Sequence, residues 1–397
     1  MIANEKKALL LTNMTELIEL PESAYQKAKD RYEDIGEWLG RDESLCKDND
    51  PHIFPQGSFR LGTAIRPLEE DEAYDLDLAC KLREGINKGS LTQETLKNLV
   101  GHEIETYRTA RGIKTQKEEK HRCWRLEYQD DLNFYMDIVP CIPADDLRRK
   151  FILESMKKAG ENEIISGLAS QLTVAITDDR HPGYRQICQD WNISNPEGYA
   201  KWFEVRMNQT HQIILGKAQV DDVPLFKRKT PLQRSIQWLK RHRDQMFKGD
   251  NEVKPISIII TTLAARAYQG ESDIESALRK ILFHMGIFVS SGSSVVLNPV
   301  NPEENFADRW SMSQYSHLNL KENFGRWVIQ AQIDFDIISS SDDMSFITEQ
   351  AVQKFSVRMN VSDLKELLGI APASVSVITP KVHTISEPTP KPWRMNK

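Results

Sequence analysis

Two aspartates in the stretch YDLDLAC (residues 74–80), Asp75 and Asp77, lie two positions apart. Residues two apart on a β-strand face the same side, so both carboxylates would project together, with Leu76 and Leu78 on the opposite, core-facing side. Burying unpaired charge is costly, and a divalent cation is a suitable partner for two carboxylates. Taken alone, the pair fits a solvated strand face more readily.

A third aspartate, Asp137, lies in another apolar stretch, FYMDIVP. If the two strands are neighbours, the three carboxylates converge and repel one another unless divalent ions lie between them. Magnesium takes a few carboxylates and completes its shell with water and substrate phosphates, and two such ions can activate a hydroxyl and stabilise a leaving pyrophosphate. We therefore predict a site for two Mg²⁺ ions, or Mn²⁺ in their place, held by Asp75, Asp77 and Asp137.

A turn-forming pair, Gly57-Ser58, precedes these strands, with the serine 17 residues before Asp75. Glycine takes backbone angles that other residues avoid, and it lets a phosphate approach closely. The serine supplies a hydroxyl and an amide, and a helix beginning there would favour anions. The chain has no G-x-x-x-x-G-K-[ST] motif, so the pair is not part of a P-loop.

The elements that position these groups follow from residue periodicity. Residues 3–48 are predicted to be helical, with a new helix starting at Pro21. A later helix has Thr230 as its N-cap and Pro231 as its first residue, and the pattern beyond it is mostly helical to about residue 370. Between them we expect a strand at 73–82, a helix at 91–112, and an antiparallel hairpin formed by 121–128 and 133–142.

Composition narrows the class of protein. The chain has 397 residues, too many for one typical core, so two lobes are expected. Its net charge of −6 argues against a protein that coats nucleic acid, and no stretch is long and apolar enough to span a bilayer. The N-terminus lacks the apolar core of a signal peptide, so we expect a cytoplasmic location. The five cysteines form no C-x-x-C pair, and His121 with Cys123 is at most half a metal site.

The combination of Gly-Ser, a D-x-D strand and a later aspartate strand resembles the polymerase-β-like nucleotidyltransferase superfamily. Within it, FPQGSFRLGTAIRP and YDLDLAC are similar to the bacterial cGAS/DncV-like nucleotidyltransferases, which make cyclic oligonucleotide messengers in CBASS anti-phage defence. The resemblance covers most of residues 50–310 through four further stretches: ISNPEGYAKWF (193–203), LQRSIQWLKRHRD (232–244), KPISIIITTLAA (254–265) and NPVNPEENFADRW (298–310).

The resemblance implies an α+β fold with a polymerase-β-like core, a mixed sheet and a helical lobe that closes a cage around the nucleotide. It divides the chain into N-terminal helices packing on the core (1–49), the catalytic core (50–215), the helical lobe (216–370) and a flexible Pro-rich tail (371–397). No counterpart of the zinc-binding thumb of animal members is present. Some bacterial members are conjugated through a small C-terminal residue, which the ending Met395-Asn396-Lys397 makes doubtful here.

The resemblance also assigns roles. The metal triad falls on Asp75, Asp77 and Asp137. Groups around the donor triphosphate fall on Gln56, Gly57, Ser58, Arg60, Lys240 and Ser257, and Asn305 would line the cleft. Lys240 lies in a basic helix, as phosphate binding requires, whereas Arg241 and Arg243 fit a solvated helix face equally well. Tyr184 and Trp191 offer surfaces for base stacking, although large aromatics more often form core.

The implied function is synthesis of a cyclic di- or trinucleotide from ATP and a second NTP, with release of pyrophosphate and a downstream effector that responds to the product. A linear oligonucleotide synthase resembling the oligoadenylate synthases is the enzymatic alternative, and a catalytically inactive nucleotide sensor is the other. The overall acidity disfavours any version that needs long RNA. Base choice, linkage and ring size depend on loop geometry that the sequence does not determine.

Overall fold

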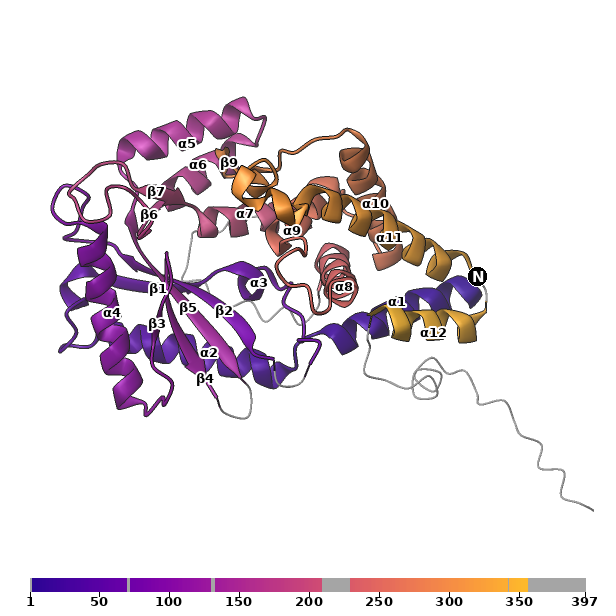
Figure 1. The fold of residues 1–397 in the computed structure, drawn as a ribbon, viewed down its shortest axis with the longest axis horizontal. Coiled ribbons are helices and arrows are strands. Elements are labelled where there is room, and N and C mark those ends of the chain that lie inside the picture. The colour runs from indigo at the N-terminus through magenta and orange to yellow at the C-terminus, as the bar shows by residue number, and fades with distance from the viewer. Residues whose placement is uncertain (1, 70–71, 130–132, 209–228, 342, 356–397) are drawn as a thin grey trace, which may run out of the picture.

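The computed structural model describes residues 2–69, 72–129, 133–208, 229–341 and 343–355. One lobe is built on a seven-stranded mixed sheet in the order β1-β2-β5-β4-β3, with β6 and β7 continuing from the far end of β5 (Figure 1). The strands β2 and β5 are parallel, and the other neighbours are antiparallel. The strands are β1 (Pro51–Pro55), β2 (Tyr74–Leu82), β3 (Glu118–Glu119), β4 (Trp124–Tyr128), β5 (Phe134–Pro143), β6 (Val174–Ile176) and β7 (Asn192–Ser194).

Two helices, α2 (Glu22–Gly40) and α4 (Gln93–Ala110), cover one face of this sheet. The alternation in β2 explains why: Leu76, Leu78 and every second residue after them are fully buried against these helices. Asp75 and Asp77 therefore face the other side, toward the helical lobe. The predicted strands, the helix at 91–112 and the β4–β5 hairpin are confirmed.

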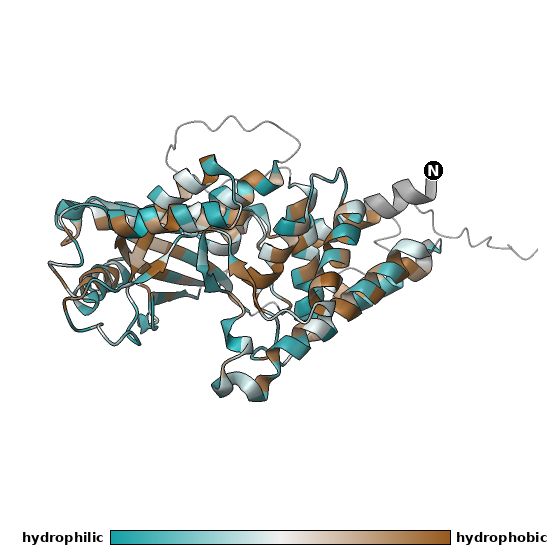
Figure 2. Ribbon diagram, turned by 90° about the horizontal axis from the view of Figure 1, so that it is seen from above, coloured by the Kyte–Doolittle hydropathy of each residue, from teal (hydrophilic) through white to brown (hydrophobic). Residues whose placement is uncertain are grey.

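The second lobe is helical and has its own hydrophobic core. Its helices show brown and teal on different sides, which is the pattern of elements with one buried face (Figure 2). Thr230 and Pro231 begin α8 as predicted, with a capping box between Thr230 and Gln233. The helices are α8 (Pro231–Met246), α9 (Ser257–Ala267), α10 (Ile274–Ser290), α11 (Leu320–Ser340) and α12 (Met344–Phe355).

The domain boundaries drawn from the sequence differ from the packing. The helix α1 (Ile2–Ile18) packs in the core of the helical lobe, whereas α2 packs on the sheet, so residues 1–49 are shared between the lobes. Apolar residues of three helices placed in the catalytic core also join the helical lobe: α5 (Asp146–Lys158), α6 (Glu163–Leu172) and α7 (Pro196–Met207). The predicted boundary at 215 and the predicted tail at 371–397 lie outside the described residues.

A small hairpin, β8 (Leu297–Asn298) with β9 (Asn301–Asn305), interrupts the region predicted to be mostly helical. Short elements complete the chain: the helix α3 (Gly57–Leu61) and the 3₁₀ turns Lys47–Asn49, Asp308–Trp310 and Ser313–Leu318. No helix in the described part of the chain is long and apolar enough to cross a membrane.

Candidate active site

The three aspartates meet where β2 and β5 run side by side. Asp77 pairs in register with Asp137 on β5, and Asp137 pairs in register with Arg125 on β4. Neighbouring strands are about 4.8 Å apart, so one row across the sheet carries two carboxylates and then a guanidinium. Arg125 binds Asp137 through two hydrogen bonds, of 2.6 and 2.7 Å. The strands β2 and β5 are neighbours, which is the arrangement that the predicted convergence requires, and Arg125 is a partner that the sequence analysis missed.

The carboxylates of Asp75 and Asp77 are only partly neutralised by nearby positive charges, as their raised pKa values show. Burial, together with the charges of Asp75 and Asp137, raises the pKa of Asp77 to about 7. Burial also raises the pKa of Asp75, against the opposing pull of Arg125. Carboxylates that hold their protons so tightly gain from any added cation. Within the described residues, however, no three His, Cys, Asp or Glu side chains are placed to hold a metal ion together, because Asp137 is turned to Arg125.

Gly57 begins α3 directly against this carboxylate row. Its φ of +61° favours glycine, and a Cβ at this position would overlap Oδ2 of Asp77 and lie 3.2 Å from its Cγ. The amide of Gln56 donates to the carbonyl of Asp77 (2.8 Å), which fixes the start of the helix to β2. Ser58 lines the same cavity. The Gly-Ser pair and the D-x-D strand therefore form one unit.

The helix α8 holds the backbone that follows this unit. Gln233, Gln237, Lys240 and Arg241, which recur on one helix face, donate to four carbonyls between residues 61 and 66: those of Leu61, Ala64, Thr63 and Arg66, at 2.7–3.0 Å. Buried carbonyls need such partners. The helical lobe thus positions the Gly-Ser segment through its backbone.

Cationic side chains of the helical lobe face the carboxylates. Burial and the nearby Arg243 lower the pKa of Lys240 to about 7, while Asp244, Asp77 and Asp75 oppose this shift. Arg243 binds Asp244 and donates to Oγ of Ser257 (2.8 Å), the first residue of α9. Lys240 and Ser257 therefore lie where the sequence analysis expected them, at the cavity that contains Asp75 and Asp77.

The cavity between the lobes has a volume of about 1130 Å³. It is lined by the Gly-Ser pair, by Asp75 and Asp77, and by the start of α9. Further polar and aromatic residues line it that the sequence analysis did not place at the site, among them Arg66, Tyr74, Arg125, Tyr135, Asp244, Lys248 and Lys254. Lys254 is the first residue of the stretch KPISIIITTLAA that also contains Ser257. Its positive charge next to a predicted phosphate contact could have identified it as a candidate.

Two residues predicted beside the triphosphate, Gln56 and Arg60, do not line the cavity. Arg60 is buried on the far side of α3 and forms an ion pair with Glu204 of α7 at 2.7 Å. The side chain of Gln56 donates to the carbonyl of Leu78. Asn305, which was expected to line the cleft, lines a second, adjoining cavity. Its side chain also accepts from the amides of Val296 and Ala307 and so holds the β8–β9 hairpin together. Gln56 and Arg60 flank the Gly-Ser pair in the sequence, but their side chains point away from the cavity, toward Leu78 and Glu204.

Other candidates are also placed by the structure. Tyr184 and Trp191 are buried in the core and line neither cavity. Arg241 is buried and donates to the Arg66 carbonyl, whereas Arg243 reaches the cavity. His121 contacts Asp179 rather than Cys123, and the cysteines are free thiols.

The fold and these residues define a nucleotidyltransferase of the polymerase-β type. Residues 51–140 match the family model of the nucleotidyltransferase domain of cyclic GMP-AMP synthase DncV-like proteins. A c-di-GMP synthase of Roseivirga ehrenbergii is 31% identical over 307 residues, 76% of this chain and 72% of the relative. The chain therefore belongs to the DncV-like nucleotidyltransferases, a family of cyclic dinucleotide synthases.

Solved structures agree on the fold. CdnG of Bradyrhizobium diazoefficiens, solved in complex with GTP, superposes with a TM-score of 0.65 at 19% identity, over 92% of this chain and 99% of that one. DncV of Vibrio cholerae, solved with the linear intermediate 5′-pppA(3′,5′)pG, gives a TM-score of 0.53 at 16% identity, over 91% and 89% of the two chains.

If Lys240 binds the donor triphosphate as predicted, replacing it with alanine should raise the KM for the donor nucleotide about 10- to 100-fold, because a charge-assisted phosphate contact would be lost. Steady-state kinetics with purified variants would measure it. Lys157→Ala is the matched control, since Lys157 pairs with Glu163 on the surface and lines neither cavity. Unchanged kinetics for Lys240→Ala would move the phosphate contact to Arg243 or Lys254.

Proposed function

We propose that this enzyme joins guanine nucleotides into a cyclic dinucleotide and releases pyrophosphate. The observation that carries the proposal is the placement of Gly57, Asp75, Asp77 and Lys240 around one inter-lobe cavity. The choice of GTP is supported by the relatives, a c-di-GMP synthase and a CdnG bound to GTP. The family resemblance supports a cytoplasmic role in anti-phage signalling, with an effector that binds the product.

Divalent metal ions fit the acidic end of this cavity. Asp75 and Asp77 present carboxylate oxygens, which Mg²⁺ binds together with water and phosphate oxygens. Their raised pKa values indicate that a nearby positive charge would stabilise the ionised carboxylates. Two ions would require Asp137 to turn from Arg125 toward the other two carboxylates. When bound, such ions supply an activated hydroxyl and charge neutralisation at the leaving pyrophosphate.

The protein residues supply position and charge. The backbone at Gly57 and Ser58 and the ammonium group of Lys240 would hold the donor triphosphate, while α8 keeps the segment after α3 in place. The acceptor hydroxyl must lie near Asp75 and Asp77, in line with the scissile bond. Cyclisation then needs the linear intermediate to reverse, so that its own triphosphate occupies the donor site. A cleft between two lobes that retains the intermediate favours this step, because a retained intermediate reacts at a high effective concentration.

The test is incubation of the purified protein with all four labelled NTPs and Mg²⁺ or Mn²⁺, followed by phosphatase treatment and mass spectrometry. We expect a phosphatase-resistant product containing guanine and only traces of linear species. A ladder of lengthening, phosphatase-sensitive chains would favour a linear synthase. No turnover under any condition would favour a nucleotide sensor.

Magnesium affinity is expected to rise with pH between about 6 and 8. The pKa of Asp77 is raised to about 7 in the metal-free protein, so a proton competes with the metal below that value. Calorimetric Mg²⁺ titrations at pH 6, 7 and 8 should show a Kd that falls up to about tenfold per pH unit below the pKa, following one-proton linkage. An Asp77→Asn variant should lose the part of this dependence that titrates near pH 7, and a pH-independent wild-type Kd would exclude Asp77 as a ligand.

A further inference from the structure

A second cavity, of about 800 Å³, adjoins the first between the lobes. The two share residues 252, 254–256 and 309 in their linings, so they form one continuous cleft. Its two rims carry opposite net charge. The core rim presents four basic or imidazole side chains and one carboxylate: Lys120, His121, Arg122, Arg180 and Asp178. The rim from the helical lobe presents four carboxylates and two cations: Glu252, Glu303, Glu304, Asp308, Lys254 and Arg309.

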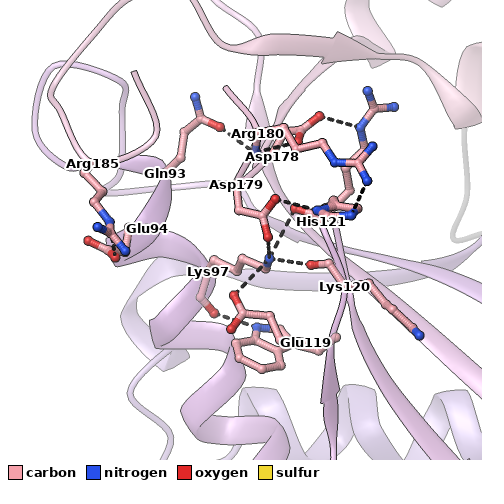
Figure 3. Close-up of polar contacts among 12 residues, drawn as sticks. Gln93, Glu94, Lys97, Glu119, Lys120, His121, Asp178, Asp179, Arg180 and Arg185 are labelled. Atoms are coloured by element: carbon pink, nitrogen blue, oxygen red, sulfur yellow. Dashed lines mark hydrogen bonds and ion pairs between the residues drawn. The ribbon is translucent and has the colours of Figure 1, made fainter. Parts of the chain in front are cut away.

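A buried lysine binds the backbone and side chains that form the core rim (Figure 3). Lys97 of α4 is fully buried, donates to the carbonyls of Lys120 and His121, and forms ion pairs with Glu119 (3.0 Å) and Asp179 (3.8 Å). One ammonium group thus fixes the turn before β4 to the loop that contains Arg180. A rim anchored in this way is preorganised for a ligand.

Of the cations on this rim, Arg180 has the least negative charge bound to it, since Lys120 and Arg122 each form an ion pair with a carboxylate. Its guanidinium contacts Nε2 of His121, whose Nδ1 lies 2.7 Å from Asp179. The consistent tautomer has Nδ1–H donating to Asp179 and Nε2 accepting from Arg180, so the imidazole orients the guanidinium without neutralising it. Within the described residues Arg180 has no carboxylate partner, whereas Arg122 pairs with Asp178 at 2.7 Å.

The distance between the core rim and the carboxylates Asp75 and Asp77 is short enough for one nucleotide to reach both. Arg122 precedes Arg125 by three residues, which span at most about 11 Å of extended chain. Arg125 lines the first cavity, together with Asp75 and Asp77. A nucleotide whose sugar hydroxyl lies near Asp75 and Asp77 therefore has its 5′-phosphates within reach of the second cavity. The four carboxylates on the opposite rim outnumber its two cations, so the core rim is the more favourable side for those phosphates.

We infer that Arg180, supported by Arg122, binds the 5′-triphosphate of the acceptor nucleotide in this second cavity. The inference rests on the proposed nucleotidyl transfer. It makes Arg180 a determinant of acceptor binding, separate from the donor contacts at Gly57, Ser58 and Lys240. His121 and Lys97 act as positioning residues.

The test compares two acceptors that differ only in the triphosphate. With saturating 2′,3′-dideoxy-GTP as a donor that cannot itself accept, either GTP or guanosine is supplied as acceptor, and the linear products are quantified by mass spectrometry. The wild type is expected to prefer GTP over guanosine by tenfold or more in kcat/KM. Arg180→Ala should lower this preference about tenfold by raising the KM for GTP alone. His121→Ala should lower it less, also through KM.

Arg185→Ala is the matched control. Arg185 lies on the same loop as Arg180, pairs with Glu94 on the surface and lines neither cavity (Figure 3). Equal use of GTP and guanosine by the wild type would overturn the inference. An equal loss with both acceptors in Arg180→Ala, or an equal loss of preference in Arg185→Ala, would overturn it too. Absence of any wild-type product would instead contradict the proposed function.

Discussion

An enzyme carrying both Asp75→Asn and Asp77→Asn is expected to lose about a thousandfold or more of its cyclic dinucleotide synthesis while it keeps its fold. The two carboxylates face the cavity, and their removal leaves the buried leucines on the other face of β2 untouched. Losing metal-assisted charge stabilisation costs several kcal/mol, and each 1.36 kcal/mol is a factor of ten in rate. Product formation at saturating Mg²⁺ would measure the effect.

The same variant should be more stable than the wild type in metal-free buffer. A carboxyl group whose pKa is raised from 3.8 to about 7 on folding favours the folded state below pH 4, and this contribution is lost as the pH rises through 7. The gain in melting temperature should therefore be small near pH 4.5 and largest at pH 7 or above. Full activity in the double variant would end the nucleotidyltransferase assignment.

Most of the carboxylate row could be predicted because local patterns determine it. Alternation in YDLDLAC placed the two aspartates on one face, and the apolar run around Asp137 placed it in a buried strand. Arg125 was predictable too. Leu126 must pair with Met136 if both face the core, and this register places Arg125 opposite Asp137.

Contacts between distant segments could not be predicted in this way. The sequence of α8 shows a basic, amphipathic helix, but not that Gln233, Gln237 and Arg241 bind carbonyls about 170 residues earlier in the chain. The pairing of Arg60 with Glu204 is also long-range, and it turns a residue of the Gly-Ser motif away from the cavity. The packing of α1 depends on the helical lobe, which the local pattern of α1 does not reveal.

Gly57→Ala is expected to lower kcat/KM by at least about a hundredfold, through two separate effects. The left-handed backbone at φ +61° costs a residue with a Cβ about 1–2 kcal/mol. In addition, the new methyl group would overlap Oδ2 of Asp77, so either the carboxylate or the start of α3 must move. A displacement of about 1 Å at reacting groups costs on the order of a hundredfold in rate.

Gly112→Ala separates the two effects. Gly112 also has a positive φ, of +65°, but a Cβ there would meet nothing within 4 Å. Gly112→Ala should therefore lose only the unfolding free energy of the left-handed backbone and Gly57→Ala at least that amount in denaturant titrations, while only Gly57→Ala loses activity and Mg²⁺ affinity. If Gly57→Ala kept wild-type Mg²⁺ affinity and lost activity only in proportion to its stability, the contact with Asp77 would have no role beyond the fold. The close approach of a glycine to a carboxylate would then be a packing detail, and the link between the Gly-Ser turn and the D-x-D strand would have to run through the hydrogen bonds of Gln56 to the carbonyls of Asp77 and Leu78.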